Sequence, residues 1–375
     1  MHNRESEFEQ AKNERMYFPE LDGLRFFAFL LVFISHQSLL SNIPYLSSVF
    51  NFGWIGVDLF FSLSAYLFTK LLISENLKSG TISFRKFYAR RVFRIWPVYY
   101  FFVGFSILYF LIIVDGVVTS PILTRLIGLL TFTDNIFCIT HGYDLLPFIT
   151  HLWTIAYEEQ FYVFIPVLIF ILTRSSHRTK IIWFVLSVVI FNLARIAFIY
   201  NKVPHPAIYV LPFTHFESII LGIALGFGGF DFLLTRFKSI YFLIIGILLF
   251  LVVIQLPNVQ FISYWLTLTY SIVGLLTSFI VFSVLHNKKL IYFFSISAFV
   301  FLGKRSYGLY VYHTLGMAMA HALFKINIGL SLNPLSAFVF GLFFTIVISI
   351  ISYRIIEKPF LLLKKKYEIV VSRPI

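Results

Sequence analysis

The stretch LRFFAFLLVFISHQ, residues 24–37, decides how this chain is to be interpreted. It is apolar throughout except for Arg25 near one end and His36 near the other, a pattern typical of a helix that crosses a lipid bilayer. As an α-helix it places both side chains on one face, because they are about three full turns and about 16 Å apart. We expect Arg25 near the inner end of this helix and His36 toward the outer half.

Each of these side chains also has a less specific explanation. Arg25 is compatible with an arginine that reaches the inner lipid headgroups while its stem stays in apolar surroundings. His36 is compatible with an interfacial histidine that is hydrogen-bonded to a neighbour. Ionisable groups inside a span are nevertheless costly and usually face a cavity or a partner.

The composition extends the membrane interpretation to the whole chain. Hydrophobic residues make up 59% of it and charged residues 13%, with a mean hydropathy of +0.87. Soluble domains do not have this composition, and apolar runs of about 20 residues recur as bilayer-spanning helices require. The candidate spans lie at about 22–40, 54–72, 97–114, 121–139, 151–172, 181–200, 211–229, 240–256, 264–285, 306–325 and 335–356. We predict an all-α polytopic membrane protein.

The distribution of Lys and Arg predicts the orientation. If 121–139 crossed the bilayer, the basic stretch TRSSHRTK at 173–180 would lie outside, against the positive-inside tendency. If it folds back on the outer side, most of the 30 Lys and Arg residues lie inside. The net charge of +13 then reflects topology, and nucleic-acid binding is not expected.

We therefore predict about ten transmembrane helices in a cytoplasmic (inner) membrane, with both termini cytoplasmic. The expected organisation is a cytoplasmic segment over 1–21, one transmembrane domain over 22–356 and a basic cytoplasmic tail over 357–375.

Six blocks of sequence resemble the integral-membrane acyltransferase-3 family in order and spacing. They read PELDGLRFFAFLLVFISH, GWIGVDLFFSLSAYLF, FYARRVFRIWPVYY, HLWTIAYEEQFYVFIPVL, LGKRSYGLYVYHT and YRIIEKPF, from Pro19 to Phe360. Members are multi-span O-acyltransferases of surface glycans and some small molecules. The chain departs from the family at Ala65 and Thr154, where Gly and Ser are usual.

The resemblance implies roles for particular residues. It makes His36 the catalytic base and places Arg25 on the path of the acyl donor. It assigns the phosphates of acyl-CoA to three arginines of the third block, and it matches the Trp and Glu-Glu block at Trp153, Glu158 and Glu159, with Tyr162 behind. The three arginines are Arg90, Arg91 and Arg94.

The residue types themselves suit acyl transfer. Acyl transfer from a thioester to a hydroxyl needs a base near neutral pH, and histidine suits that role. Arginine pairs bidentately with phosphate oxygens, although the basic stretch is also compatible with a positive-inside anchor. Adjacent helical residues point about 100° apart, so only one of Glu158 and Glu159 can face the site. Glu158 aligns with Tyr162 and with His151, so we expect it to pair with His36 or to orient the acceptor, unless it pairs with a structural arginine.

The remaining polar groups in apolar segments are less specific. Asp58 is expected either to orient a catalytic side chain or to make a packing hydrogen bond, and Arg195 is expected to pair with Glu217. Supporting or cavity-lining roles are expected for Ser306, Tyr310 and His313. The spacings contain no metal-ligand set, so no metal is predicted.

The sequence therefore predicts an O-acyltransferase, most simply an O-acetyltransferase. Its donor would be cytoplasmic acetyl-CoA, bound as a substrate with no permanently bound cofactor, and its acceptor an extracytoplasmic glycan or glycolipid. Two alternatives stay open: a multi-span transporter with an intramembrane His/Arg pathway, and an acyltransferase that acts on a small molecule or lipid.

Overall fold

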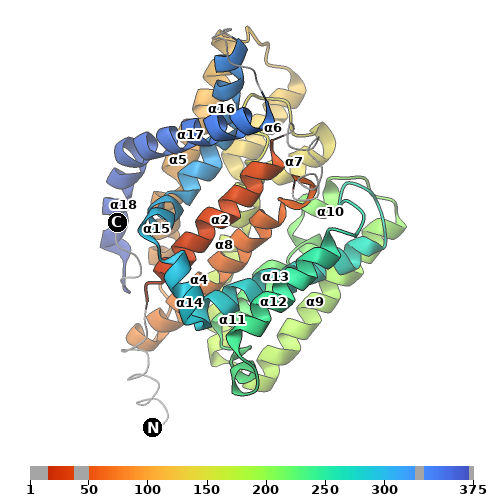
Figure 1. Cartoon of the computed structure of the whole chain (residues 1–375), viewed down its shortest axis with the longest axis vertical. Helices are drawn as coiled ribbons and strands as arrows, with labels where there is room; N and C mark the ends of the chain where they lie inside the picture. Colours follow the sequence, from red (N-terminus) through yellow and green to blue (C-terminus); the bar gives the residue numbers. More distant parts are fainter. Residues whose placement is uncertain (1–15, 38–49, 326–332, 371–375) are drawn as a thin grey trace.

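The computed structural model describes residues 16–37, 50–325 and 333–370. Within these residues the chain is helical, with no β-strand. The helices form one bundle in which α2 lies near the centre, against α4, α15 and α16 (Figure 1). The structure therefore fits the all-helical polytopic membrane protein that the sequence predicts.

The first half of the chain includes the central helix α2 and its neighbour α4. The helices of this half are α2 (Pro19–Ser35), α4 (Ile55–Ser79), α5 (Phe84–Ile112), α6 (Ser120–Thr131), α7 (Asp134–His141), α8 (Trp153–Arg174) and α9 (His177–Tyr200).

The second half completes the bundle with helices of more varied length. Their bounds are α10 (Ala207–Val210), η2 (Pro212–Thr214), α11 (Glu217–Gly226), η3 (Asp231–Thr235), α12 (Ser239–Val253), α13 (Trp265–His286), α14 (Lys288–Phe294), α15 (Ser297–Lys304), α16 (Ser306–Lys325), α17 (Pro334–Ser352), η4 (Tyr353–Glu357), α18 (Lys358–Lys364) and η5 (Lys365–Tyr367).

Among the described residues, 6 helical segments are long and apolar enough to cross a membrane. They are Phe50–Ser79, Phe84–Ile112, Trp153–Arg174, His177–Tyr200, Trp265–His286 and Pro334–Tyr367. The central helix α2, with 17 residues, covers about 26 Å, slightly less than a ~30 Å hydrocarbon core. The total of ten spans and the cytoplasmic side of both termini stay predictions.

The outer surface of the bundle is apolar where lipid would lie. Large side chains along α9 and α12 are exposed, among them Leu186, Ile190 and Leu248. An apolar surface of this extent is costly in water and favourable against acyl chains.

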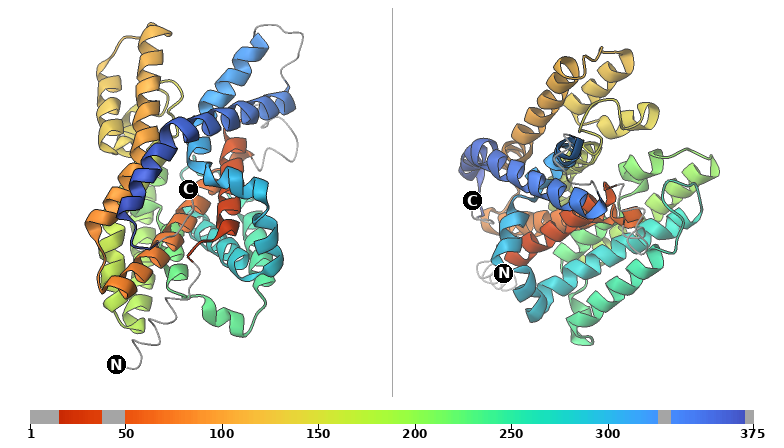
Figure 2. Two further views of the ribbon diagram at one scale, coloured as in Figure 1. Left: turned by 90° about the vertical axis from the view of Figure 1, so that its left-hand side faces the viewer. Right: turned by 45° about the horizontal axis from the view of Figure 1, so that its top comes forward.

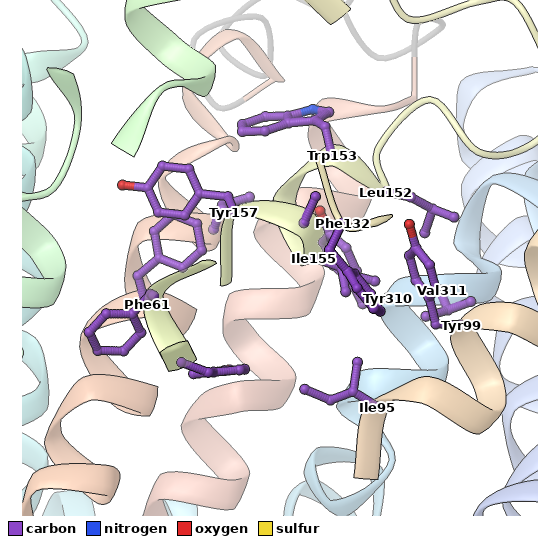
Figure 3. Packing of buried hydrophobic residues seen from close by; sticks show 14 of the residues in the cluster. Phe61, Ile95, Tyr99, Phe132, Leu152, Trp153, Ile155, Tyr157, Tyr310 and Val311 are labelled. Carbon is purple, nitrogen blue, oxygen red and sulfur yellow. The ribbon is translucent and has the colours of Figure 1, made fainter. Parts of the chain in front are cut away.

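The largest buried apolar cluster joins α4, α5, α8 and α16. Phe61 of α4 stacks on Tyr157 of α8, with ring centroids 4.8 Å apart, and the cluster continues through Ile95, Ile155 and Tyr310 (Figure 3). Ile95, Ile155 and Tyr310 also line a cavity. The apolar core therefore forms one wall of the site described below.

The ambiguous segment 121–139 is broken rather than continuous. α6 ends at Thr131, Phe132 adopts a left-handed conformation with φ 54°, and α7 begins at Asp134. Arg125 of α6 and Asp134 of α7 form a buried ion pair, Nε to Oδ1 3.0 Å. Helices of about 18 Å and 12 Å do not cross a ~30 Å core, so a single spanning helix is excluded here and a folded-back segment fits.

The basic stretch that joins the predicted spans 54–72 and 97–114 is helical rather than an irregular connection. α4 continues to Ser79 and α5 begins at Phe84, with Gly80 turning the chain at φ 73°. A left-handed glycine just after a helix ends it without a Cβ clash. The arginines at 90, 91 and 94 are consequently held at helical spacing on α5, which determines the direction of each.

The last helix continues into the segment that the sequence assigned to a tail. α17 is followed without a break by a π-helical turn, Tyr353–Glu357, and then by α18. The π-turn precedes Pro359, which has no N–H for a regular α-helical bond. α17 and α18 differ in direction, and α18 lies along α5 (Figure 2).

Candidate active site

A cavity lies between α2, α4, α5, α8, α16 and α18. One set of lining side chains is cationic: Arg25, Lys70, Arg91, Arg94 and Lys364. A second set is uncharged and polar: Ser64, Thr154, Tyr162, Ser306, Tyr307 and Tyr310. Glu158 and Asp22 supply the carboxyl groups of the lining. The cavity therefore joins a positively charged region to hydroxyl groups deep in the bundle.

The hydroxyl groups of Thr154 and Tyr310 mark the deep part of the cavity. Their oxygens are 2.6 Å apart, and the Tyr310 hydroxyl also lies 3.3 Å from the backbone carbonyl of His151. Thr154 keeps the hydroxyl of the family's usual serine at this position. The pair connects the cavity lining directly to a group of histidines.

Three histidines meet beside Tyr310. The His313 ring centroid lies 4.7 Å from that of His36 and 4.3 Å from that of His151, both edge to face. The Tyr310 ring lies 5.1 Å from His151 and 5.6 Å from His313. We call His36, His151 and His313 the histidine cluster.

Backbone carbonyls set the tautomers of two of these rings. His36 Nδ1 donates to the Val32 carbonyl at 2.9 Å, and His313 Nδ1 donates to the Tyr310 carbonyl at 2.5 Å. A carbonyl oxygen can only accept, so the proton of each neutral ring sits on Nδ1 and the lone pair on Nε2. The exposed His36 ring thus offers Nε2 as a base.

Several ring nitrogens of the cluster are buried without a hydrogen-bond partner in the described residues. They are Nε2 of His313 and both ring nitrogens of His151. Buried polar atoms of this kind are rare and call for a ligand, a water or a functional role. No group of His, Cys, Asp and Glu in the described ranges is arranged to hold a metal ion.

Glu158 lies on the cavity side of α8 and Glu159 does not. The Tyr162 hydroxyl donates to Glu158 at 3.0 Å, whereas Glu159 accepts from the indole N–H of Trp96 at 3.4 Å. Within the described residues no hydrogen bond or ion pair joins Glu158 to His36. His151 precedes α8, so the helical alignment expected between it and Glu158 does not exist. A catalytic role for Glu158 stays a prediction.

The four predicted donor-binding arginines do not all reach the cavity. Arg25, Arg91 and Arg94 line it, and Arg91 lies over the Phe68 ring at 4.5 Å. Arg90 instead forms a buried ion pair with Glu75 at 2.8 Å and donates to the Tyr367 carbonyl at 2.9 Å. Adjacent positions on α5 point about 100° apart, so Arg90 and Arg91 face different neighbours.

Asp58 belongs to a separate buried network. Its Oδ1 accepts from Ser218 Oγ at 2.6 Å and from His215 Nε2 at 2.9 Å. The histidine that it orients is thus His215, outside the histidine cluster. In the same region Arg195 pairs with Glu217, as expected. This network joins α4 to the α9, α11 and α13 side of the bundle.

The remaining supporting residues divide between lining and packing. Ser306 and Tyr310 line the cavity, while the Trp153 ring packs on Tyr209, with centroids 4.9 Å apart. Sequence reasoning missed Lys70 and Lys364 as lining residues and missed the approach of His151 to His36. Lys364 lies in a run of three lysines, and no local pattern distinguishes one of them.

In this all-helical membrane protein the histidine cluster does not line the cationic cavity but lies beside its lining residue Tyr310, an arrangement suited to group transfer inside a bilayer. The chain belongs to the acyltransferase-3 family, whose model, described as an acyltransferase domain, matches residues 18–354.

Two relatives from Staphylococcus aureus illustrate the similarity. A protein of strain COL, provisionally named an O-acetyltransferase, is 32% identical over 383 residues, which cover 96% of this chain and 59% of that protein. The O-acetyltransferase OatA of strain NCTC 8325 is 30% identical over 359 residues, 92% of this chain and 57% of OatA. The chain thus spans less than two thirds of the length of these relatives. No solved structure matches it.

Proposed function

We propose that this chain is a membrane O-acetyltransferase that moves an acetyl group from cytoplasmic acetyl-CoA to a hydroxyl of an extracytoplasmic glycan or glycolipid. The observation that carries the proposal is the cavity itself. It connects Arg25, Arg91 and Arg94 to the Thr154–Tyr310 hydroxyl pair, which lies against the histidine cluster. Family membership and the two O-acetyltransferase names support the reaction class.

The cationic part of the cavity suits the nucleotide end of the donor. Acetyl-CoA carries several phosphate charges, and arginine forks match phosphate oxygens with two parallel hydrogen bonds. With those charges held at Arg91 and Arg94, the flexible arm of the donor would point along the cavity toward Thr154. Its thioester would then approach the histidine cluster, while the polyanionic nucleotide stays on the cytoplasmic side.

His36 is the proposed general base. Its Nε2 takes the proton of the acceptor hydroxyl as the oxygen attacks the thioester carbonyl carbon. The C–S bond breaks, the new ester leaves on the acceptor, and the thiolate of CoA takes the proton back from the imidazolium. The Val32 carbonyl keeps Nδ1 protonated throughout, so Nε2 is the nitrogen that cycles.

The direct test is cleavage of acetyl-CoA by the purified chain, followed as release of free thiol, with water or an added soluble sugar as the hydroxyl acceptor. We expect His36→Ala to lower the rate by about 10²–10⁴-fold, the usual contribution of a general base. His286→Ala is a matched control, because His286 Nδ1 makes the same kind of bond to the Phe282 carbonyl at 2.9 Å but lies outside the cluster. Unchanged activity in well-folded His36→Ala protein would rule out this mechanism.

The acceptor needs its own experiment. Mass spectrometry of surface glycans and glycolipids from cells with and without the chain should show acetyl groups, a mass difference of about 42 Da each, that depend on His36. Acetylation of only small soluble molecules would overturn the proposed acceptor and leave the donor chemistry in place.

A further inference from the structure

The helix α18 brings a lysine into the cavity from beyond the family-matched region. Lys364 lines the cavity although it follows residue 354, the last residue matched by the family. The residue as a whole is buried, at 8% relative exposure, and its ammonium lies 3.1 Å from Glu368. The next two residues, Lys365 and Lys366, are exposed. The three lysines thus share the same chemistry but differ in burial.

Contacts with α5 hold this segment in position. Arg90, itself paired with Glu75, donates to the Tyr367 carbonyl at 2.9 Å. The Phe93 ring stacks on Tyr367 with centroids 5.6 Å apart, and on Phe360 at 6.5 Å. The helix that presents Arg91 and Arg94 to the cavity therefore also docks the segment that presents Lys364.

The charge of the cavity lining points to an anionic ligand. Five cationic side chains meet two carboxyl groups, Asp22 and Glu158, among the described lining residues. Burying an ammonium close to guanidinium groups is unfavourable unless an anion compensates. Glu368 supplies one such anion to Lys364, and a phosphate group could replace it. Lysine binds phosphate as a point charge beside the forks of the arginines.

We infer that Lys364 is a phosphate-binding residue of the donor site and that the segment 358–368 holds it there. The inference rests on the proposed function, since the phosphates are those of the nucleotide part of acetyl-CoA. Until the donor binds, the Lys364 ammonium stays in its ion pair with Glu368. Loss of Lys364 should therefore weaken donor binding, and loss of the Glu368 charge should strengthen it.

The test measures donor binding to the full chain in nanodiscs of phosphatidylcholine. For acetyl-CoA we expect Lys364→Ala to raise Kd about tenfold, the effect of one charge-assisted contact, and Lys364→Arg to restore most of the affinity. Lys365→Ala and Lys366→Ala should leave Kd unchanged, and Glu368→Gln should lower it. Acetyl-pantetheine, which lacks the nucleotide phosphates, should show no difference between wild type and Lys364→Ala.

Each other outcome has a definite meaning. Equal affinity of wild type and Lys364→Ala for acetyl-CoA overturns the inference while the proposed function stands. Equal losses for acetyl-CoA and acetyl-pantetheine overturn it in favour of a structural role, and thermal melting of each variant shows whether the fold is affected. If Lys364→Ala changes only the response to added phosphatidylglycerol, the residue binds a lipid phosphate instead and the donor assignment fails. A wild-type chain that binds no acetyl-CoA overturns the proposed function and this inference together.

Discussion

At the scale of single residues, one hydrogen bond to a backbone carbonyl sets the protonation pattern of the His36 ring for proton transfer. The Val32 carbonyl fixes Nδ1 as the donor, which leaves Nε2 as the only basic nitrogen of the neutral ring. His313 has the same arrangement, since its Nδ1 donates to the Tyr310 carbonyl. Two rings with the same fixed tautomer therefore stand edge to face, and the Nε2 of the second is buried without a partner in the described structure.

We predict that His313 contributes to the rate of proton transfer at His36 and does not only pack against its ring. Phenylalanine at 313 keeps an aromatic edge against His36 and removes the lone pair of Nε2, which can accept a hydrogen bond from the acceptor hydroxyl. We expect His313→Phe to lower kcat about 10²-fold, at the low end for acid–base groups, with the KM for acetyl-CoA within about twofold of wild type. The pH dependence of kcat should change shape.

Steady-state kinetics between pH 5.5 and 9 provide the measurement for His313→Phe. His321→Phe is the control, because His321 lies on the same helix and its Nδ1 bonds a carbonyl in the same way, at 2.8 Å from Met317 O. A His313→Phe enzyme with wild-type kcat and an unaltered pH profile would reduce His313 to a packing residue.

At the scale of helices, rotation by about 100° per residue explains which member of a polar pair faces the cavity. Glu158 faces it and Glu159 contacts Trp96, and on α5 the same rule separates Arg91 from Arg90. The direction of Glu158 could be predicted because its helix was recognisable from sequence. The direction of Arg90 could not, since it lies between the predicted spans 54–72 and 97–114, where no helix was predicted.

The two faces of α5 lead to different predicted effects on kinetics. Arg91→Ala and Arg94→Ala should each raise the KM for acetyl-CoA about tenfold, the loss of one charge-assisted contact, with little change in the dependence on acceptor concentration. Lysine at either position should restore only part of the loss, because it returns the charge without the fork.

A donor and acceptor titration of each arginine variant provides the check, with Arg85→Ala as the control for an exposed arginine on the same helix. Equal effects on donor and acceptor would indicate general damage to the fold and would remove these arginines from the donor site.

Contacts between distant helices set the limit of what the sequence could predict about the site. His36, His151 and His313 come from three different parts of the chain, and only packing of α2, α8 and α16 around one core brings their rings together. Lys364 lines the cavity because a π-helical turn continues the last helix beyond the predicted end of its span. Local periodicity contains neither piece of information, although it was sufficient for the all-helical class and for the approximate positions of the long helices α4, α8, α9, α13 and α17.

At the scale of the whole molecule, topology decides whether the proposed chemistry is possible. CoA is a cytoplasmic metabolite and cannot cross a bilayer, so the proposed reaction requires the cationic part of the cavity to open to the cytoplasm. His36 lies at the end of α2 opposite to Arg25, which places the base nearer the other side. The acetyl group alone would then pass between compartments. The connection 41–53 between the first two predicted spans falls largely outside the described residues, but Asn51 and Thr81, before and after α4, are described and exposed.

Cysteine labelling at these two positions tests the orientation. With the buried Cys138 replaced by Ala, Asn51→Cys in intact cells should react with an impermeant maleimide and Thr81→Cys should not, while a permeant maleimide should label both. The physical reason is that α4 is long and apolar enough to span the bilayer once; its two ends would then face opposite compartments, with the basic end retained inside. Labelling of Thr81→Cys alone would put Arg91 and Arg94 on the side that has no CoA, and the acetyl-CoA mechanism could not operate in this protein.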